Sequence, residues 1–179
     1  GYDPRGRSAA NTHLMLNVGD AAPDFTLQND SGEDITLDAL LAPGPIVLYF
    51  YPRDFTPVCT AEACMFRDAG DELAEAGVRV VGVSSQGKAS HERFKRTFRL
   101  NFTLLSDPEK KAARAYGAVG LFGLPIPFFT SRVTYLISKD KRILDRICAE
   151  VSLSAHQAFV KRVLKAMSAA NANSAPTVT

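Results

Sequence analysis

The chain has 179 residues, of which 46% are hydrophobic and 22% charged, and its formal net charge is +2. A collagen-like, coiled-coil or wholly disordered chain would show a short repeat, a narrow alphabet or an excess of charge, so these classes are excluded, and this length suits one domain. The weak basic balance argues against a nucleic-acid partner. Three cysteines are an odd number in a chain too large to need disulfide staples, which indicates chemical use of thiols in a reducing compartment.

The two ends of the chain differ in composition from its body. Residues 1–14 are mostly polar and contain no apolar signal-peptide core, so we interpret them as a vector remnant or flexible extension, with Met15 as the native start. Residues 15–167 are expected to form the single domain. Residues 168–179 lack charge and large apolar side chains, which is typical of a tail. No apolar run reaches the roughly 18 residues of a membrane span, so we expect a soluble, cytoplasmic protein without a membrane partner.

The body of the chain begins with a predicted hairpin over residues 18–37, with its turn at residues 30–32 (DSG). Residues 46–51 (IVLYFY) then form a continuous apolar run between a Pro-Gly-Pro cluster and Pro52, which is typical of a buried central strand. Residues 57–76 have apolar side chains at helical spacing and end at a glycine, so they predict a helix. A second buried strand is predicted over residues 78–84 (VRVVGVS).

The remaining segments continue the alternation of helices and strands. They predict a helix, a short strand, a helix, two strands of a hairpin and a terminal amphipathic helix with Ser154 as its N-cap, over residues 90–99, 102–105, 108–116, 132–138, 142–148 and 154–167. This order predicts an α/β fold in which helices flank a central mixed sheet, with an N-terminal hairpin. Thioredoxin-like folds have the same order of elements.

A candidate nucleophile follows the first buried strand. Thr56 suits the N-cap of the next helix, Pro57 suits its first position, and Cys59 then occupies its third position. Unpaired backbone N–H groups and the helix dipole favour an anion at this place, so they would stabilise a thiolate. The alternative is that Cys59 is simply a small buried residue.

The spacing between Cys59 and Cys64 sets a condition on any disulfide between them. Residues five apart in an ideal helix have Cα atoms about 8 to 9 Å apart, whereas a disulfide needs roughly 4.4 to 6.8 Å. If these cysteines form a disulfide during turnover, the first turns of the helix must unwind. Cys64 is also compatible with a purely structural role facing the core.

These residues resemble a known family. Pro52, Thr56 and Cys59 match the P-x-x-x-T-x-x-C signature of peroxiredoxins on a thioredoxin-like scaffold, and a second cysteine after four intervening residues resembles the bacterioferritin comigratory protein, or Q-type, branch. The resemblance extends to residues 18–27 (VGDAAPDFTL), 105–117 and 131–138, and it covers roughly residues 17–166.

The resemblance implies a peroxidase. Cys59 would be the peroxidatic cysteine, which attacks the O–O bond and becomes a sulfenic acid. Thr56 would bind the peroxide through its hydroxyl, and Pro52 would shield the site from water. Arg132 would stabilise the Cys59 thiolate and polarise the peroxide, and backbone N–H groups near Val58 and Cys59 would stabilise the developing charge.

The resemblance also implies how the enzyme returns to its thiol form. Cys64 would be the resolving cysteine, giving an intramolecular disulfide that thioredoxin or a similar dithiol reduces. Hydrogen peroxide and organic hydroperoxides would be the substrates. No cofactor or metal is implied, and we expect a monomer or weak homodimer. The alternatives are a thiol–disulfide oxidoreductase, which Thr56 and Arg132 disfavour, and a non-catalytic thioredoxin-like binding or chaperone module.

Other candidate residues carry weaker predictions. Cys148 is expected to be structural, with a backup resolving role as the alternative. Arg53 and Asp54 are expected to be solvated or supporting residues, and the three histidines show no metal-ligand spacing.

The segment from residue 119 to residue 130 (VGLFGLPIPFFT) is unusually apolar for a loop. It would be an apolar wall for organic hydroperoxides, including Phe128 and Phe129, a protein interface, or a loop folded over the core.

Overall fold

The computed structural model describes residues 15–120, 130–149 and 152–174. Within them, one seven-stranded sheet has the order β2-β1-β5-β4-β3-β6-β7. The strands are β1 (Thr26–Asn29), β2 (Asp34–Thr36), β3 (Ile46–Phe50), β4 (Arg79–Ser84), β5 (Thr103–Ser106), β6 (Val133–Ile137) and β7 (Ile143–Cys148). β4 pairs in parallel with β3 and β5, whereas the other pairs are antiparallel, so the sheet is mixed as predicted.

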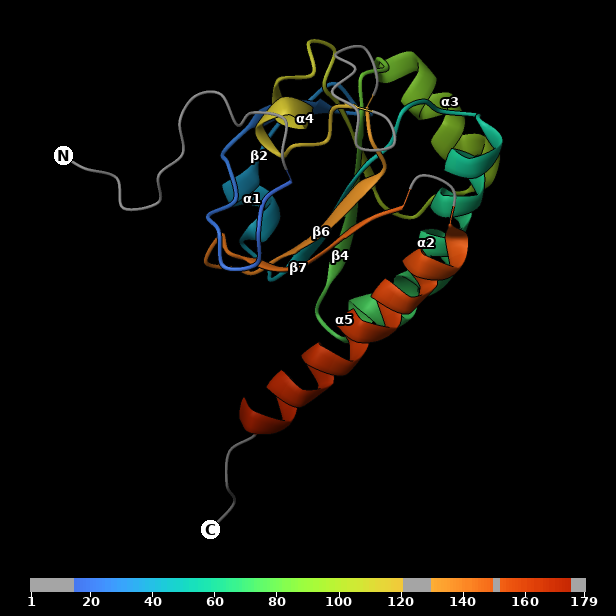
Figure 1. The fold of residues 1–179 in the computed structure, drawn as a ribbon. Helices are drawn as coiled ribbons and strands as arrows, with labels where there is room; N and C mark the ends of the chain where they lie inside the picture. Colours follow the sequence, from blue (N-terminus) through green and yellow to red (C-terminus); the bar gives the residue numbers. More distant parts are fainter. Residues whose placement is uncertain (1–14, 121–129, 150–151, 175–179) are drawn as a thin grey trace, which may run out of the picture.

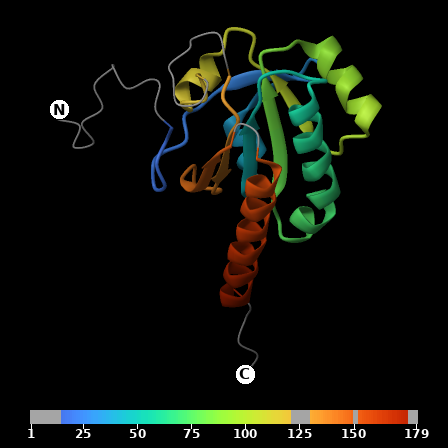
Figure 2. The same ribbon diagram turned by 45° about the vertical axis from the view of Figure 1, so that its right-hand side comes forward.

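Helices cover both faces of the sheet (Figure 1). One face packs against α1 (Leu37–Leu41) and α4 (Lys111–Ala115). The other face packs against α2 (Pro57–Glu75), α3 (Lys88–Phe98) and α5 (Leu153–Ser174). Figure 2 shows α2 and α3 on the same side of the sheet, with α5 running beyond the sheet edge. This arrangement confirms the predicted α/β thioredoxin-like fold.

The central strand β3 divides the core in two because successive side chains point to opposite faces. Ile46, Leu48 and Phe50 contact the α1/α4 side, whereas Val47 and Tyr49 contact the α2/α3/α5 side. All five residues of β3 are buried, which explains the continuous apolar run. The consequence for function is that a side chain's position along a strand decides which core it enters.

The predicted elements are present, with corrections at their ends. α4 begins only at Lys111, because Lys110 has a left-handed backbone (φ 55) and Asp107 accepts hydrogen bonds from the N–H groups of Ala112 and Ala113. α5 begins earlier than predicted: Ser154 lies inside it, and the cap is Ser152, whose Oγ accepts from the Ala155 N–H at 3.2 Å.

α5 also continues to Ser174, into the segment predicted to be a tail. Several alanines in residues 168–174 are strong helix formers, so loss of charge did not end the helix. The short helix α1 was not predicted. Among the described residues, no helix is long and apolar enough to cross a membrane.

Candidate active site

Cys59 lies at the carboxyl end of the central strand, where β3 passes through residues 51–56 into α2. Thr56 has extended backbone angles and Pro57 is the first helical residue, so Cys59 is the third, as predicted. The thiol is 1% exposed. The first N–H groups of a helix have no acceptor within it, so those of Val58 and Cys59 are available to an anion at this end of α2.

Arg132, directly before β6, contacts Cys59 from the strand that neighbours β3. Its Nη1 donates to the Cys59 Sγ at 2.6 Å, and the residue is only 9% exposed. β6 pairs with β3 so that Val133 lies opposite Phe50, which brings the end of one strand next to the start of the other. The structure therefore places a buried guanidinium against the candidate nucleophile, where it favours the thiolate.

Thr56 is the residue before the helix, but its side chain does not cap α2 as predicted. Its hydroxyl instead donates to the Arg53 carbonyl at 3.0 Å. Donating in this way leaves the oxygen lone pairs of Thr56 available as acceptors. A cavity of about 350 Å³ opens beside this hydroxyl; Pro52, Thr56, Ser85, Gln86 and Lys110 are among its lining residues.

Asp54 holds the loop between β3 and α2 in place, which is the supporting one of the two roles expected for it. It is 3% exposed and accepts hydrogen bonds from the Tyr51 hydroxyl at 2.5 Å, the Ser90 hydroxyl at 2.8 Å and the His91 Nδ1 at 2.7 Å. Burial, together with the nearby Asp54 charge, raises the pKa of Tyr51 well above its usual range. Arg53 is exposed, as expected.

Cys64 lies one and a half turns further along the unbroken helix α2 and is half-buried. Both it and Cys59 are thiols in this structure. The predicted spacing therefore holds here: α2 is continuous from Pro57 to Glu75, so this conformation keeps the two sulfurs apart.

Sequence reasoning missed a buried ion pair next to Cys59. The Glu62 Oε2 lies 2.6 Å from the His156 Nε2, and the two residues are 1% and 2% exposed. Two signals were available. Glu62 is one turn after Cys59 on the same face of the helix, and His156 shares the apolar face of α5 with Phe159 and Val160.

Cys148, which is expected to be structural, is exposed. It lies opposite Val133 in the β6–β7 register, and directly opposed residues share a face of the sheet. Val133 belongs to the core on the α1/α4 side, whereas Cys59 belongs to the core on the α2/α3/α5 side. The two thiols thus belong to opposite faces of the sheet, which disfavours the backup resolving role.

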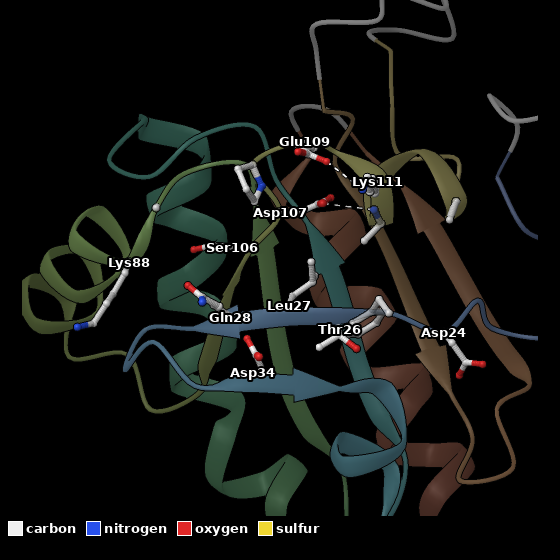
Figure 3. Close-up of a pocket in the computed structure, with 15 residues that line it drawn as sticks. Asp24, Thr26, Leu27, Gln28, Asp34, Lys88, Ser106, Asp107, Glu109 and Lys111 are labelled. Carbon is white, nitrogen blue, oxygen red and sulfur yellow. Dashed lines mark hydrogen bonds and ion pairs between the residues drawn. The ribbon is translucent and has the colours of Figure 1, made fainter.

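A second cavity is lined by none of the predicted site residues that the structure describes. It has a volume of about 530 Å³ and lies between β1 and α4, and Figure 3 shows Leu27, Ser106 and Lys111 among its lining residues. Phe128 and Phe129 lie outside the described residues. In the described part of the chain, no group of three His, Cys, Asp or Glu side chains is arranged to hold a metal ion.

Comparison with known proteins identifies the family. Residues 18–146 match the AhpC/TSA family. The chain belongs to this family of peroxiredoxins. Its similarity is to the bacterioferritin comigratory protein, or peroxiredoxin Q, branch, so this peroxiredoxin is a thiol-dependent peroxidase that reduces peroxides.

Relatives of this peroxiredoxin agree in sequence and in fold. Chloroplastic peroxiredoxin Q of Oryza sativa is 43% identical over 127 residues, which cover 70% of this chain and 56% of the plant protein. The crystal structure of peroxidoxin BcpB from Mycobacterium tuberculosis is 38% identical with a TM-score of 0.76, and the match covers 86% of this chain and 98% of that one. A structure of the Xanthomonas campestris bacterioferritin comigratory protein is 29% identical with a TM-score of 0.72, covering 86% and 96%.

Proposed function

We propose that this peroxiredoxin reduces hydrogen peroxide and organic hydroperoxides at Cys59. The observation that carries the proposal is the 2.6 Å contact between the Arg132 Nη1 and the Cys59 Sγ at the start of α2. A buried guanidinium at a helix N-terminus favours the thiolate, which is the nucleophilic form of cysteine. Among the three cysteines, Cys59 is the one that combines these two features.

The proposed reaction uses the thiolate as a two-electron reductant. The Cys59 sulfur attacks one peroxide oxygen, the O–O bond breaks, and Cys59 becomes a sulfenic acid. The other oxygen leaves as hydroxide or alkoxide and takes up a proton from solvent, giving water or an alcohol. Arg132 stabilises the charge that moves onto this leaving oxygen, and its several N–H donors allow it to contact sulfur and oxygen together.

The residues around Cys59 are assigned to binding the peroxide. The Thr56 hydroxyl already donates to the Arg53 carbonyl, so its oxygen accepts from the O–H group of the peroxide. The N–H groups of Val58 and Cys59 donate to the peroxide oxygens. Pro52 lines the access cavity beside Thr56 and limits water around the reacting atoms.

Cys64 is assigned the resolving role. Its thiol attacks the sulfenic sulfur of Cys59, a disulfide forms and water leaves. A thioredoxin-like dithiol then reduces this disulfide and is itself oxidised to a disulfide. Because α2 keeps the two cysteines apart, its first turns unwind during each cycle.

A related structure supports the organic substrates. The Xanthomonas campestris bacterioferritin comigratory protein was solved as trapped-intermediate and ligand complexes to explain its alkyl peroxide reduction activity. The cavity of about 350 Å³ beside Thr56 is large enough for an alkyl group.

Three single substitutions test the assignment. Cys59→Ser is expected to abolish peroxide consumption. Cys64→Ser is expected to form sulfenic acid once, detected by dimedone labelling, but not to cycle with thioredoxin. Cys148→Ser is the matched control and is expected to cycle normally, because Cys148 is on the other face of the sheet.

Mass spectrometry of the peroxide-treated protein then identifies the disulfide. A peptide that joins Cys59 and Cys64 is expected. An active Cys59→Ser variant would overturn the assignment of the nucleophile, and a disulfide through Cys148 would overturn the resolving role of Cys64.

A further inference from the structure

The buried pair of Glu62 and His156 joins the helix that carries Cys59 to the C-terminal helix. Glu62 is on α2 and His156 is in the first turns of α5, and the two helices pack together on the same face of the sheet (Figure 1). Their side chains are 2% and 3% exposed, and the two facing atoms are 2.6 Å apart. Among the described residues, His156 is the only group that forms an ion pair with Glu62.

The geometry fixes the number of protons that the pair requires. The His156 Nδ1 lies 3.0 Å from the Ser152 carbonyl oxygen, which can only accept, so Nδ1 carries a proton. The other ring nitrogen faces a carboxylate oxygen, which also accepts unless it is itself protonated. The contact is favourable only when a second proton lies between Nε2 and Oε2. Removing that proton leaves a lone pair of Nε2 facing a buried carboxylate.

The surroundings do not replace this proton. Arg132, before β6, is the charged group besides Glu62 that acts on His156, and its positive charge lowers the pKa of His156. On the other side of the pair, the Glu62 charge acts on the Tyr49 hydroxyl of β3. In the described part of the chain, the two Glu62 carboxylate oxygens, the His156 Nε2 and the Tyr49 hydroxyl are all buried without a hydrogen-bond partner, so the 2.6 Å contact between Oε2 and Nε2 is an ion pair. A carboxylate in this position is therefore stabilised chiefly by protonated His156.

The position of Glu62 connects the pair to the proposed catalytic cycle. Glu62 lies between Cys59 and Cys64 in the helix, so the stretch that must unwind to bring the two sulfurs together contains it. Unwinding this stretch moves Glu62 away from α5 and separates the pair. While the contact is intact, it opposes the conformational change that resolution requires.

We propose that the Glu62–His156 pair is a proton-dependent contact that holds the first turns of α2 closed and thereby sets how readily Cys59 reaches Cys64. The proposal rests on the proposed function in its use of Cys64 as the resolving residue. Glu62 and His156 act here as positioning residues. They act through the conformation of α2 and do not contact the peroxide.

The direction of the pH dependence follows from proton linkage. Burial lowers the pKa of His156, but the hydrogen bond and charge of Glu62 outweigh burial, so the pKa lies above its ordinary value. When α2 opens, His156 returns toward its ordinary value of about 6.5. The closed form therefore binds more protons. Its advantage is complete below about pH 6.5 and declines as the pH rises through the pKa of the closed form, by up to about tenfold per pH unit.

Hydrogen–deuterium exchange of the first turns of α2 tests the proposal without peroxide. A background with Cys59→Ser and Cys64→Ser removes the titration of both thiols. Protection of the amides of residues 58–64, corrected for the intrinsic pH dependence of exchange, is measured from pH 6 to pH 9. This protection is compared in three proteins: the background, the background with His156→Gln, and the background with Glu62→Gln.

We expect the background protein to lose protection of these amides progressively between pH 6 and pH 9. His156→Gln is expected to show low protection that does not change with pH, and Glu62→Gln, which removes the buried charge, is expected to abolish the pH dependence. Arg162→Gln is the matched control, because it breaks the exposed pair between Arg162 on α5 and Asp145. It is expected to follow the background protein.

Two results would overturn the proposal. One is equal protection at pH 6 and pH 9 in the background protein, and the other is an unchanged pH dependence in His156→Gln. In the chain with its native cysteines, His156→Gln is further expected to yield less sulfinic acid at pH 6.5 under excess peroxide, because faster opening lets Cys64 intercept the sulfenic acid. Failure of the proposed function is distinguishable from failure of this proposal. If the proposed function is wrong, the protein does not turn over peroxide, but the exchange result is unaffected.

Discussion

Replacing Arg132 by methionine tests the electrostatic basis of the site. The substitution keeps a long unbranched side chain but removes the guanidinium whose Nη1 lies 2.6 Å from the Cys59 Sγ. A hydrogen bond to a charged group contributes about 1.5–3 kcal/mol. Each 1.4 kcal/mol is about tenfold in rate, so the second-order rate constant for peroxide is expected to fall about 10- to 150-fold. Because Cys59 is 1% exposed, water cannot replace the lost donor without rearrangement.

The assay is competition kinetics of Cys59 oxidation by hydrogen peroxide at pH 7, with folding checked by circular dichroism. Arg146→Met is the matched control. Arg146 is on the neighbouring strand β7, opposite Tyr135, and its guanidinium donates to the Leu16 carbonyl on the other side of the sheet. The control is expected to react at the original rate. A rate for Arg132→Met within threefold of the unmodified protein would refute the reasoning.

Three further substitutions test the surroundings of the site. Asp54→Ala leaves the donors of Tyr51, Ser90 and His91 without their acceptor. It is expected to cost about 3–5 kcal/mol of unfolding free energy in urea, and a loss below 1 kcal/mol would contradict this. Gly82→Ala places a Cβ 2.9 Å from the buried ring of Tyr49, so the unfolding free energy is expected to fall by about 1–3 kcal/mol. Unchanged stability would mean that the ring moves freely. Thr56→Val removes the proposed hydrogen-bond acceptor for the peroxide and is expected to lower kcat/KM for peroxide about tenfold. Thr56→Ser keeps the hydroxyl and is expected to retain most of the activity. An equal loss of activity in both variants would indicate a packing role for Thr56.

Local patterns were sufficient to predict most of the fold. The central strand β3 is buried on both faces, so its residues form one continuous apolar run with clear ends. The start of α2 is marked by Thr56 and Pro57, which fixed the position of Cys59 in the helix. The end of α5 was missed, because a segment rich in alanine lacks the charges and large side chains used to recognise a helix.

The contacts of the supporting residues could not be predicted because their partners are distant in the sequence. Asp54 is polar and lies in a loop, so the local sequence left open whether it is solvated or supporting, and its burial depends on Ser90 and His91 at the start of α3. The contact between Glu62 and His156 likewise depends on how α2 and α5 pack. Nothing in either segment alone reveals the other.

The two-sided sheet has a consequence for the redox partners of each thiol. Cys59 and Cys64 share one helix, so their shortest route to a disulfide is within the chain. Cys148 is exposed on the opposite side, near the end of β7, where the sheet separates it from Cys59. A bulky thiol reagent attached to Cys148 would therefore extend into solvent on the side of the sheet away from Cys59. The third cysteine is thus a natural attachment point for a fluorescent reporter, since the chain contains no tryptophan.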